Sequence, residues 1–256
     1  MASPSIASTD ALSGVRVGFR LAALVGAAAV AVPLHYLWKL AGRPSPWPRR
    51  FLGTVAWLCG ARARVIGKPL RRDVFFVCNH LSWMDIPILA GATGSAFVAT
   101  AELRQAPVVG WLCTLNGTIF VRRGDRMNVA AQIADIGRAL TEGWAVTIFP
   151  EGTTSAGGTL LPFKAALLQV LDPAPPGVRV QPVVIDYGPD TSRIAWVGDE
   201  NGRDHARRTL ARRGGFPATM RFLEPFDPRD FPGRKAIAAE ARRRMETALT
   251  GDAPLL

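Results

Sequence analysis

Short apolar runs recur along the chain after residue 73, and their lengths and spacing are typical of buried β-strands. These runs occupy residues 74–78, 95–99, 117–121, 144–149, 178–185 and 218–223. Between two of them, apolar residues return at helical spacing from Val129 to Leu140, and Gly143 ends that predicted helix. Further helices are predicted over 163–171 and 233–249. Strands that alternate with helices predict an α/β fold with a mixed, largely parallel sheet flanked by helices.

The chain before residue 61 is dominated by apolar and small residues. No residue from Leu21 to Trp38 carries a formal charge, and a second apolar stretch covers 51–60. The first stretch lies at the lower length limit of a transmembrane helix, and the second is too short to span a bilayer. The alternatives are one transmembrane helix, an ordinary core helix, and two helices partly sunk in one leaflet. We favour the two helices in one leaflet.

These patterns divide the chain into three segments. Residues 1–13 are expected to form a flexible tail, residues 14–60 an element of membrane-associating helices, and residues 61–256 the α/β domain. Basic residues are more frequent after the apolar stretch than before it. The positive-inside rule then predicts an inner-membrane protein whose active domain faces the cytoplasm.

Charge is distributed unevenly, and the basic excess belongs to the N-terminal quarter. The net charge is +11, and up to Arg72 the chain has eleven Lys or Arg residues against one acidic residue, Asp10. Basic charge mixed with apolar stretches suits an anionic surface, so membrane lipids are the expected partner. The basic segments 203–213 and 241–244 lack the aromatic residues and motifs of nucleic-acid binding, so no such partner is expected. The three cysteines are far apart and indicate neither disulfides nor a metal site.

The segment NHLSWMD, from Asn79 to Asp85, directly follows the first apolar run. Loops at strand ends are where α/β folds place reactive groups. A neutral imidazole at His80 can accept a proton from a hydroxyl, and a nearby carboxylate can fix its tautomer and stabilise the imidazolium. The alternative is a structural histidine and a helix-capping aspartate. No Gly-x-Ser-x-Gly elbow is present, which favours group transfer with the substrate itself as nucleophile.

A second loop with suitable chemistry is FPEGTTS, residues 149–155, at the end of a predicted strand. Gly152 permits a tight turn and close approach of backbone N–H groups to a ligand. Glu151 can bind substrate hydroxyls, and Thr153 is the first of three hydroxyl residues that we group with it. The alternative for Glu151 is an ordinary turn residue.

Three cations complete the candidate site. Arg122 and Arg123 end the run at 117–121, and a guanidinium binds phosphate oxygens in a bidentate fork. Lys164 is a further candidate, close after the second loop. The alternatives are a solvated surface pair for the two arginines and the first turn of a helix for Lys164.

Taken together and in this order, four segments resemble the motifs of the glycerolipid acyltransferases, of the lysophosphatidate acyltransferase type. The segments are NHLSWMD, GTIFVRR, FPEGTTS and QPVVI. The first and third are close to the family's consensus. The apolar N-terminus is similar to the two-helix membrane element that some bacterial members carry.

The resemblance implies transfer of a fatty acyl group from a thioester donor, acyl-CoA or acyl carrier protein, to a lysophospholipid hydroxyl. It implies that His80 is the general base and that Asp85 orients it. Arg122 or Arg123, together with Glu151 and Gly152, would hold the acceptor's phosphate and glycerol. Pro182 and its strand would line the acyl site.

Asn79 and Ser82 belong to the first motif and are grouped with the substrate-binding residues, although the residues themselves indicate only a role in shaping the loop. The resemblance implies no metal and no organic cofactor. The acyl donor is a substrate in this interpretation.

One departure from the family pattern bears on the acceptor. The family often has a lysine just before a Glu-Leu pair, where this chain has Thr100 and Ala101. The main interpretation is acylation of 1-acyl-sn-glycerol-3-phosphate to phosphatidate. The alternative acceptor is lyso-ornithine lipid, whose hydroxyl lies on a fatty chain and which has no glycerol phosphate. A non-catalytic membrane lipid-binding protein is the second alternative.

Overall fold

The computed structural model describes the main chain of residues 6–121 and 129–251. Within these residues seven strands form one sheet in the order β1-β7-β6-β2-β5-β3-β4. Neighbouring strands are parallel, except that β6 and β7 are antiparallel. The strands are β1 (Ala61–Ile66), β2 (Val74–Cys78), β3 (Ala96–Thr100), β4 (Ile119–Val121), β5 (Ala145–Ile148), β6 (Arg179–Asp186) and β7 (Phe216–Phe222). The predicted mixed, largely parallel sheet is confirmed.

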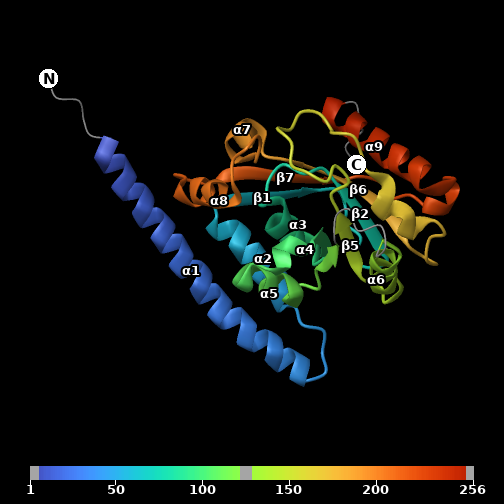
Figure 1. Cartoon of the computed structure of the whole chain (residues 1–256), viewed down its shortest axis with the longest axis horizontal. Helices are drawn as coiled ribbons and strands as arrows, with labels where there is room; N and C mark the ends of the chain where they lie inside the picture. The colour runs from blue at the N-terminus through green and yellow to red at the C-terminus, as the bar shows by residue number, and fades with distance from the viewer. Residues whose placement is uncertain (1–5, 122–128, 252–256) are drawn as a thin grey trace.

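Helices cover both faces of this sheet. The α-helices are α1 (Ile6–Leu40), α2 (Trp47–Leu58), α3 (Asp85–Thr93), α4 (Ala101–Arg104), α5 (Pro107–Leu115), α6 (Val129–Thr141), α7 (Thr191–Ile194), α8 (Gly202–Ala211) and α9 (Gly233–Thr250). The 3₁₀ helices are η1 (Ala165–Leu171), η2 (Gly188–Asp190) and η3 (Pro228–Asp230). Figure 1 shows α2 and α3 on one side of the sheet and α6 and α9 on the other, in agreement with the two hydrophobic clusters.

Strand β2 shows how the sheet divides the core. All five residues of VFFVC are buried. Because successive side chains of a strand point to opposite faces, Phe76 and Cys78 join the cluster under α2 and α3, whereas Phe75 and Val77 join the cluster under α6 and α9. A strand that is covered on both faces reads as a continuous apolar run, which is why the sequence pattern located β2 correctly.

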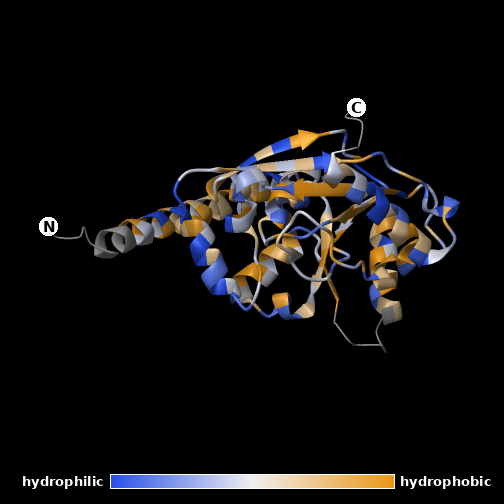
Figure 2. Cartoon of the chain, turned by 90° about the horizontal axis from the view of Figure 1, so that it is seen from above, coloured by the Kyte–Doolittle hydropathy of each residue, from blue (hydrophilic) through white to orange (hydrophobic). Residues whose placement is uncertain are grey.

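The N-terminal helix α1 is longer than the sequence pattern predicts. It begins at Ile6, inside the stretch expected to be a tail, and continues without a break past Pro33 to Leu40. One face packs along the domain, where Ala31 and His35 are buried. The segment Leu12–Leu40 is long and apolar enough to cross a membrane. Figure 2 shows apolar residues along this helix, whose N-terminal end projects beyond the rest of the chain.

Two arginines of α1 bind the end of another helix. The Arg16 Nε atom donates to the carbonyl of Ala211 at 2.8 Å, and the Arg20 guanidinium donates to the carbonyl of Leu210 at 2.6 Å. These carbonyls lie in the last turn of α8, where carbonyls have no intrahelical hydrogen-bond donor. The same turn carries the negative end of the helix dipole, which favours a cation. Part of the basic excess of the N-terminal quarter is therefore used inside the molecule and not at a membrane surface.

Two local features differ from the predictions. Strand β1 was not predicted, because its only buried residue is Ala61, and the side chains of Arg62 and Arg64 are exposed. Such charges are typical of an edge strand, where they discourage pairing with other chains. The helix predicted over 163–171 is the 3₁₀ helix η1, Ala165–Leu171.

Candidate active site

Three chain segments meet at one edge of the sheet because β2 lies between β5 and β6 and is parallel to both. The carboxyl ends of parallel strands lie at the same edge, so the residues that follow them come together. Residues 79–84 follow β2, residues 149–155 follow β5, and Tyr187 follows β6. The first two loops are joined directly: the Ser155 N–H donates to the carbonyl of His80 at 2.8 Å.

The predicted histidine–aspartate pair is formed. The Nδ1 atom of His80 lies 2.7 Å from Oδ2 of Asp85. Since a carboxylate only accepts hydrogen bonds, Nδ1 carries the proton and donates it, which leaves Nε2 as the proton-accepting nitrogen of the neutral ring. The Asp85 side chain is fully buried, whereas 18% of the His80 side chain is exposed. This arrangement suits a general base with an orienting acid.

The Asp85 carboxylate is held from several sides. Its Oδ2 atom also accepts hydrogen bonds from the backbone N–H groups of Leu81 and Ser82, at 2.7 and 2.9 Å. Its Oδ1 atom accepts a hydrogen bond from the hydroxyl of Tyr187. Asp85 is also the first residue of α3, where the helix dipole favours negative charge. These contacts keep the carboxylate in one orientation beneath the His80 ring.

Asn79 and Ser82 shape the loop from the inside. The Asn79 side chain accepts from the N–H of Ile185 at 2.8 Å and donates to the carbonyl of Ile185 at 3.0 Å, which binds the loop to β6. The hydroxyl of Ser82 is fully buried and accepts from the Met84 N–H at 3.3 Å. Both side chains therefore support the position of His80 from beneath.

Glu151 is placed differently from the expectation that it binds substrate hydroxyls. The residue is only 2% exposed. Its Oε1 accepts from the His80 N–H and its Oε2 from the Leu161 N–H, each at 3.1 Å. Burial raises the pKa of the Glu151 carboxyl, and the two N–H groups oppose that rise because they stabilise the charged form. In this structure Glu151 ties the loop of His80 to the loop after β5.

The His80 ring is also fixed by an aromatic contact. It stacks on Phe149, with ring centroids 4.0 Å apart and planes inclined by 15°. Phe149 in turn stacks on Phe97 of β3, at 5.9 Å. Phe149 thus sets the plane of the ring and Asp85 holds its hydrogen-bonded edge, so the ring has little rotational freedom.

Lys164 is brought beside the second loop. Gly152 has a φ of +70°, a conformation that side-chain-bearing residues rarely adopt, and a Cβ atom there would lie 3.0 Å from Lys164 Nζ. The Lys164 N–H donates to the carbonyl of Pro150 at 2.8 Å, and the side chains of Lys164 and Thr153 are exposed. An exposed ammonium next to this loop can bind an anionic or strongly polar group.

The other predicted site residues are placed less closely. Arg122 and Arg123 lie outside the residues that the structure describes. Pro182 is buried inside β6, where it pairs with Val77 of β2. His80 comes three residues after Val77, so Pro182 lies within the sheet and not at the edge that carries the loops. Within the described ranges, no group of three or more His, Cys, Asp or Glu side chains is arranged to hold a metal ion.

Sequence reasoning missed two residues of the site. Tyr187 was not singled out, although it lies two residues after the strand predicted over 178–185. Trp196 lies in no recognisable motif. Its backbone N–H nevertheless donates to the carbonyl of Leu81 at 2.8 Å, and its backbone carbonyl accepts a hydrogen bond from the Thr154 hydroxyl. Its ring stacks on the buried His205 of α8, at 5.3 Å. Trp196 therefore contacts both loops, and only the tertiary structure identifies it.

The helix that begins at Asp85 is stabilised at its far end by arginines from the N-terminal quarter. Arg49 donates to the carbonyls of Gly91 and Ala92, at 3.1 Å each, and Arg71 donates to the carbonyl of Ala92 at 2.8 Å. Cations favour the C-terminal end of a helix as carboxylates favour its start. Both ends of α3 thus carry the charge that its dipole prefers.

Comparison with known proteins identifies the family of the chain. The family model described as Acyltransferase matches residues 62–186, which include both loops. The chain is 34% identical over 255 residues to the lyso-ornithine lipid O-acyltransferase of Brucella abortus, covering 92% of this chain and 94% of that protein. It is 36% identical over 131 residues to the 1-acyl-sn-glycerol-3-phosphate acyltransferase of Neisseria gonorrhoeae, covering 50% and 51%.

A solved structure supports the same assignment. The crystal structure of the 1-acyl-sn-glycerophosphate (LPA) acyltransferase of Thermotoga maritima aligns with a TM-score of 0.62 and 26% sequence identity, and the alignment covers 80% of this chain and 77% of that one. The similarity in sequence extends over nearly the whole chain, and the fold is shared. The chain therefore belongs to the acyltransferase family.

Proposed function

We propose that the protein transfers a fatty acyl group from a thioester donor to the free hydroxyl of lyso-ornithine lipid. The similarity to the lyso-ornithine lipid O-acyltransferase of Brucella abortus carries this proposal, because it covers 92% of the chain. The similarity to the glycerol-phosphate enzyme of Neisseria gonorrhoeae covers only 50%. This preference replaces the main interpretation from sequence, in which lysophosphatidate was the acceptor.

The residues at the start of α4 support the same acceptor. Thr100 ends β3 and Ala101 begins α4, so no cation occupies the positions where glycerol-phosphate acyltransferases often carry a lysine. A lyso-ornithine lipid has no phosphate for such a lysine to bind. Its headgroup carries a carboxylate, and the exposed ammonium of Lys164 beside Gly152 offers that group a partner.

The geometry of the pair supports a transfer mechanism. The acceptor hydroxyl gives its proton to Nε2 of His80 while its oxygen bonds to the carbonyl carbon of the thioester. The carbon–sulfur bond then breaks, and the leaving thiolate takes the proton from the imidazolium. Asp85, 2.7 Å from Nδ1, stabilises the positive charge on the ring between these steps. General-base catalysis of this kind contributes about 10²–10⁴ in rate.

The site also has to meet a lipid substrate. The outer face of α1 carries exposed apolar side chains, among them Phe19, Val25 and Leu40. Association of this helix with the inner membrane, with the α/β domain on the cytoplasmic side, would bring the lipid acceptor to the enzyme.

Lysophosphatidate is the second candidate acceptor. This acceptor is favoured by the fold that the chain shares with the LPA acyltransferase of Thermotoga maritima, at a TM-score of 0.62. Lys164 suits a phosphate as well as it suits a carboxylate, because its ammonium acts as a point charge. The two candidates share the mechanism and differ only in the acceptor.

An acceptor screen tests the proposal. Purified protein in mixed micelles receives a labelled acyl donor, as acyl-CoA or acyl carrier protein, with either lyso-ornithine lipid or lysophosphatidate. We expect transfer to lyso-ornithine lipid, reduced at least about 100-fold by His80→Ala because the general base is lost. The matched control is His35→Ala, which removes an imidazole from α1, away from the pair. Transfer only to lysophosphatidate would show that lysophosphatidate, and not lyso-ornithine lipid, is the acceptor. Transfer to neither, with His80→Ala unchanged, would favour a lipid-binding protein.

A further inference from the structure

We propose that Tyr187 is a positioning residue of the acyl-transfer reaction, whose hydroxyl orients the Asp85 carboxylate and moderates its hold on the His80 imidazolium. The reaction itself is the one given under the proposed function. Tyr187 is fully buried and lies one residue beyond β6, at the sheet edge where the two loops meet. Its hydroxyl donates to Oδ1 of Asp85.

The two carboxylate oxygens of Asp85 have very different surroundings. Oδ2 accepts three hydrogen bonds, from His80 Nδ1 and from the N–H groups of Leu81 and Ser82. For Oδ1 the structure gives one partner among the described residues, the Tyr187 hydroxyl. A buried carboxylate oxygen without a donor is strongly unfavourable, so this hydroxyl satisfies the one oxygen that the loop after β2 leaves without a donor.

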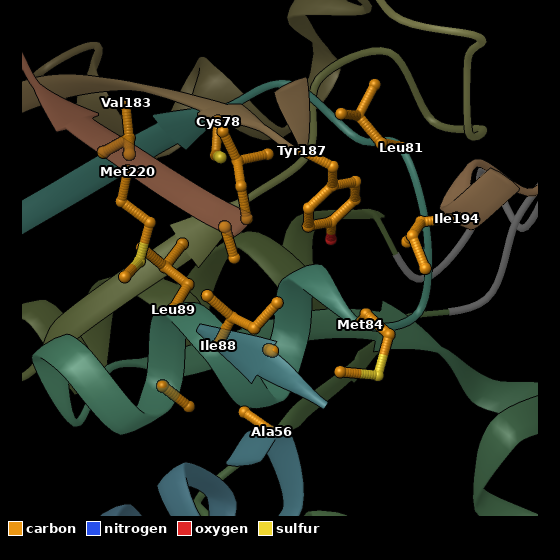
Figure 3. Close-up of a cluster of buried hydrophobic side chains, with 14 of the residues drawn as sticks. Ala56, Cys78, Leu81, Met84, Ile88, Leu89, Val183, Tyr187, Ile194 and Met220 are labelled. Carbon is orange, nitrogen blue, oxygen red and sulfur yellow. The ribbon is translucent and has the colours of Figure 1, made fainter. Parts of the chain in front are cut away.

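The Tyr187 ring is placed so that its hydroxyl has little alternative. Figure 3 shows the ring near Leu81, Met84 and Ile194, with its hydroxyl oxygen pointing away from Leu81. The ring also meets Phe216 of β7 edge-on, at 5.4 Å and 85°. Because the surroundings are apolar, Asp85 is the polar group available to a buried hydroxyl that needs a partner.

Charges from each neighbouring element bear on this network. Cys78 of β2 and Glu151 after β5 face the Asp85 carboxylate, together with Tyr187 after β6. Burial raises the pKa of Tyr187 well above its usual value, and the charge of Asp85 raises it further. Burial likewise raises the pKa of the Cys78 thiol. The phenol therefore remains protonated and acts as a donor throughout the working pH range.

The direction of the effect on His80 follows from this donor. A hydrogen bond to Oδ1 draws negative charge away from Oδ2, which weakens the attraction between the carboxylate and the imidazolium. Without the donor, the carboxylate stabilises the imidazolium more, and His80 keeps its proton to higher pH. The base is then deprotonated over a narrower range of pH, while the three hydrogen bonds to Oδ2 keep the carboxylate beside Nδ1.

Tyr187→Phe tests this inference, with Ser95→Ala as the matched loss of a buried hydroxyl. Ser95 is fully buried and hydrogen-bonded to Thr147, away from the pair. In Tyr187→Phe we expect the acid limb of the kcat profile to move to higher pH. We also expect kcat to fall about tenfold while KM for the acceptor stays within about twofold, since one interaction of the base and not of the substrate is lost. Ser95→Ala is expected to leave the acid limb in place.

The sequence allows a second test that keeps the fold intact. Tyr36 and Tyr187 are the two tyrosines of the chain, so fluorotyrosine incorporated into a Tyr36→Phe protein labels position 187 alone. Fluorination makes the phenol a stronger donor, and the acid limb is expected to move to lower pH, opposite to Tyr187→Phe. A purely structural role would shift neither profile.

The titration of His80, followed by NMR without substrates, separates this inference from the proposed function. We expect the His80 midpoint to rise in Tyr187→Phe and to fall with fluorotyrosine. Midpoints identical to those of the unmodified protein in both samples would overturn the role of Tyr187, even if acyl transfer is observed. Absence of transfer by the unmodified protein would overturn the proposed function, whereas the NMR shifts would still support the contact between Tyr187 and Asp85.

Discussion

The contact between α2 and α3 gives a sharp prediction about a single methyl group. A Cβ atom added at Gly91 of α3 would lie 2.6 Å from the Cα atom and 2.9 Å from the backbone N atom of Gly53 in α2. Both are main-chain atoms, so no side-chain rotation relieves the clash. To bring the closest contact to the 3.4 Å at which ordinary van der Waals contact begins, the two backbones must separate by about 0.8 Å.

The magnitude follows from two opposing effects. Overpacking of this kind costs about 1–3 kcal/mol, and a rigid contact between two backbones belongs to the upper part of that range. Replacing glycine by alanine inside a helix returns about 1 kcal/mol through helix propensity. Gly91→Ala is therefore expected to lower the free energy of unfolding by about 2 kcal/mol, which corresponds to a fall in Tm of about 4–8 °C for a chain of this size.

The reciprocal change supplies the control. A Cβ atom on Gly53 meets the Gly91 Cα atom at 3.6 Å, which is ordinary contact, and a Cβ atom on Gly137 of α6 meets only a methyl group of Val170, also at 3.6 Å. Gly53→Ala and Gly137→Ala are expected to leave stability unchanged or raise it by up to about 1 kcal/mol. Denaturant unfolding in micelles measures all three. A Gly91→Ala protein as stable as Gly53→Ala would refute the close packing of α2 on the helix that carries Asp85.

Three further predictions concern charge. Asp85→Asn should lower kcat by about 10²–10⁴-fold in the transfer assay, because the imidazolium loses its counter-charge. An Asp85→Asn variant with the kcat of the unmodified protein would contradict the mechanism. Arg49→Ala should lower the free energy of unfolding by about 1 kcal/mol, because two carbonyls at the end of α3 lose their donor. An unchanged midpoint of urea unfolding would contradict this capping role. The pKa of Glu240 is lowered to about 2 by hydrogen bonds from Arg243 and Arg244, so the stability it contributes is present above pH 4.5 and lost as the pH falls through about 2. Glu240→Gln should therefore unfold with a weaker dependence on pH over that interval, as seen by circular dichroism.

The pattern of apolar and polar residues predicted the strands that are buried on both faces. Strands covered on both faces, such as β2, read as unbroken apolar runs, and the two loops at their ends were recognisable because reactive groups follow buried strands. His80 and Asp85 are five residues apart, so a local turn was enough to predict their contact. The edge strand β1 and the 3₁₀ helix η1 were not predicted in that form, because edge position and helix type depend on neighbours that the local pattern does not contain.

By itself, the sequence determined the α/β fold class, the histidine–aspartate pair and the family resemblance, since these depend on local periodicity and short spacings. Only the tertiary structure decided how the site is supported. Glu151 accepts hydrogen bonds from two backbone N–H groups, and Tyr187 reaches Asp85 across 102 positions of the chain. Arg20 binds the carbonyl of Leu210 across 190 positions. Contacts at such separations arise from the packing of whole elements, and no local pattern of residues encodes them.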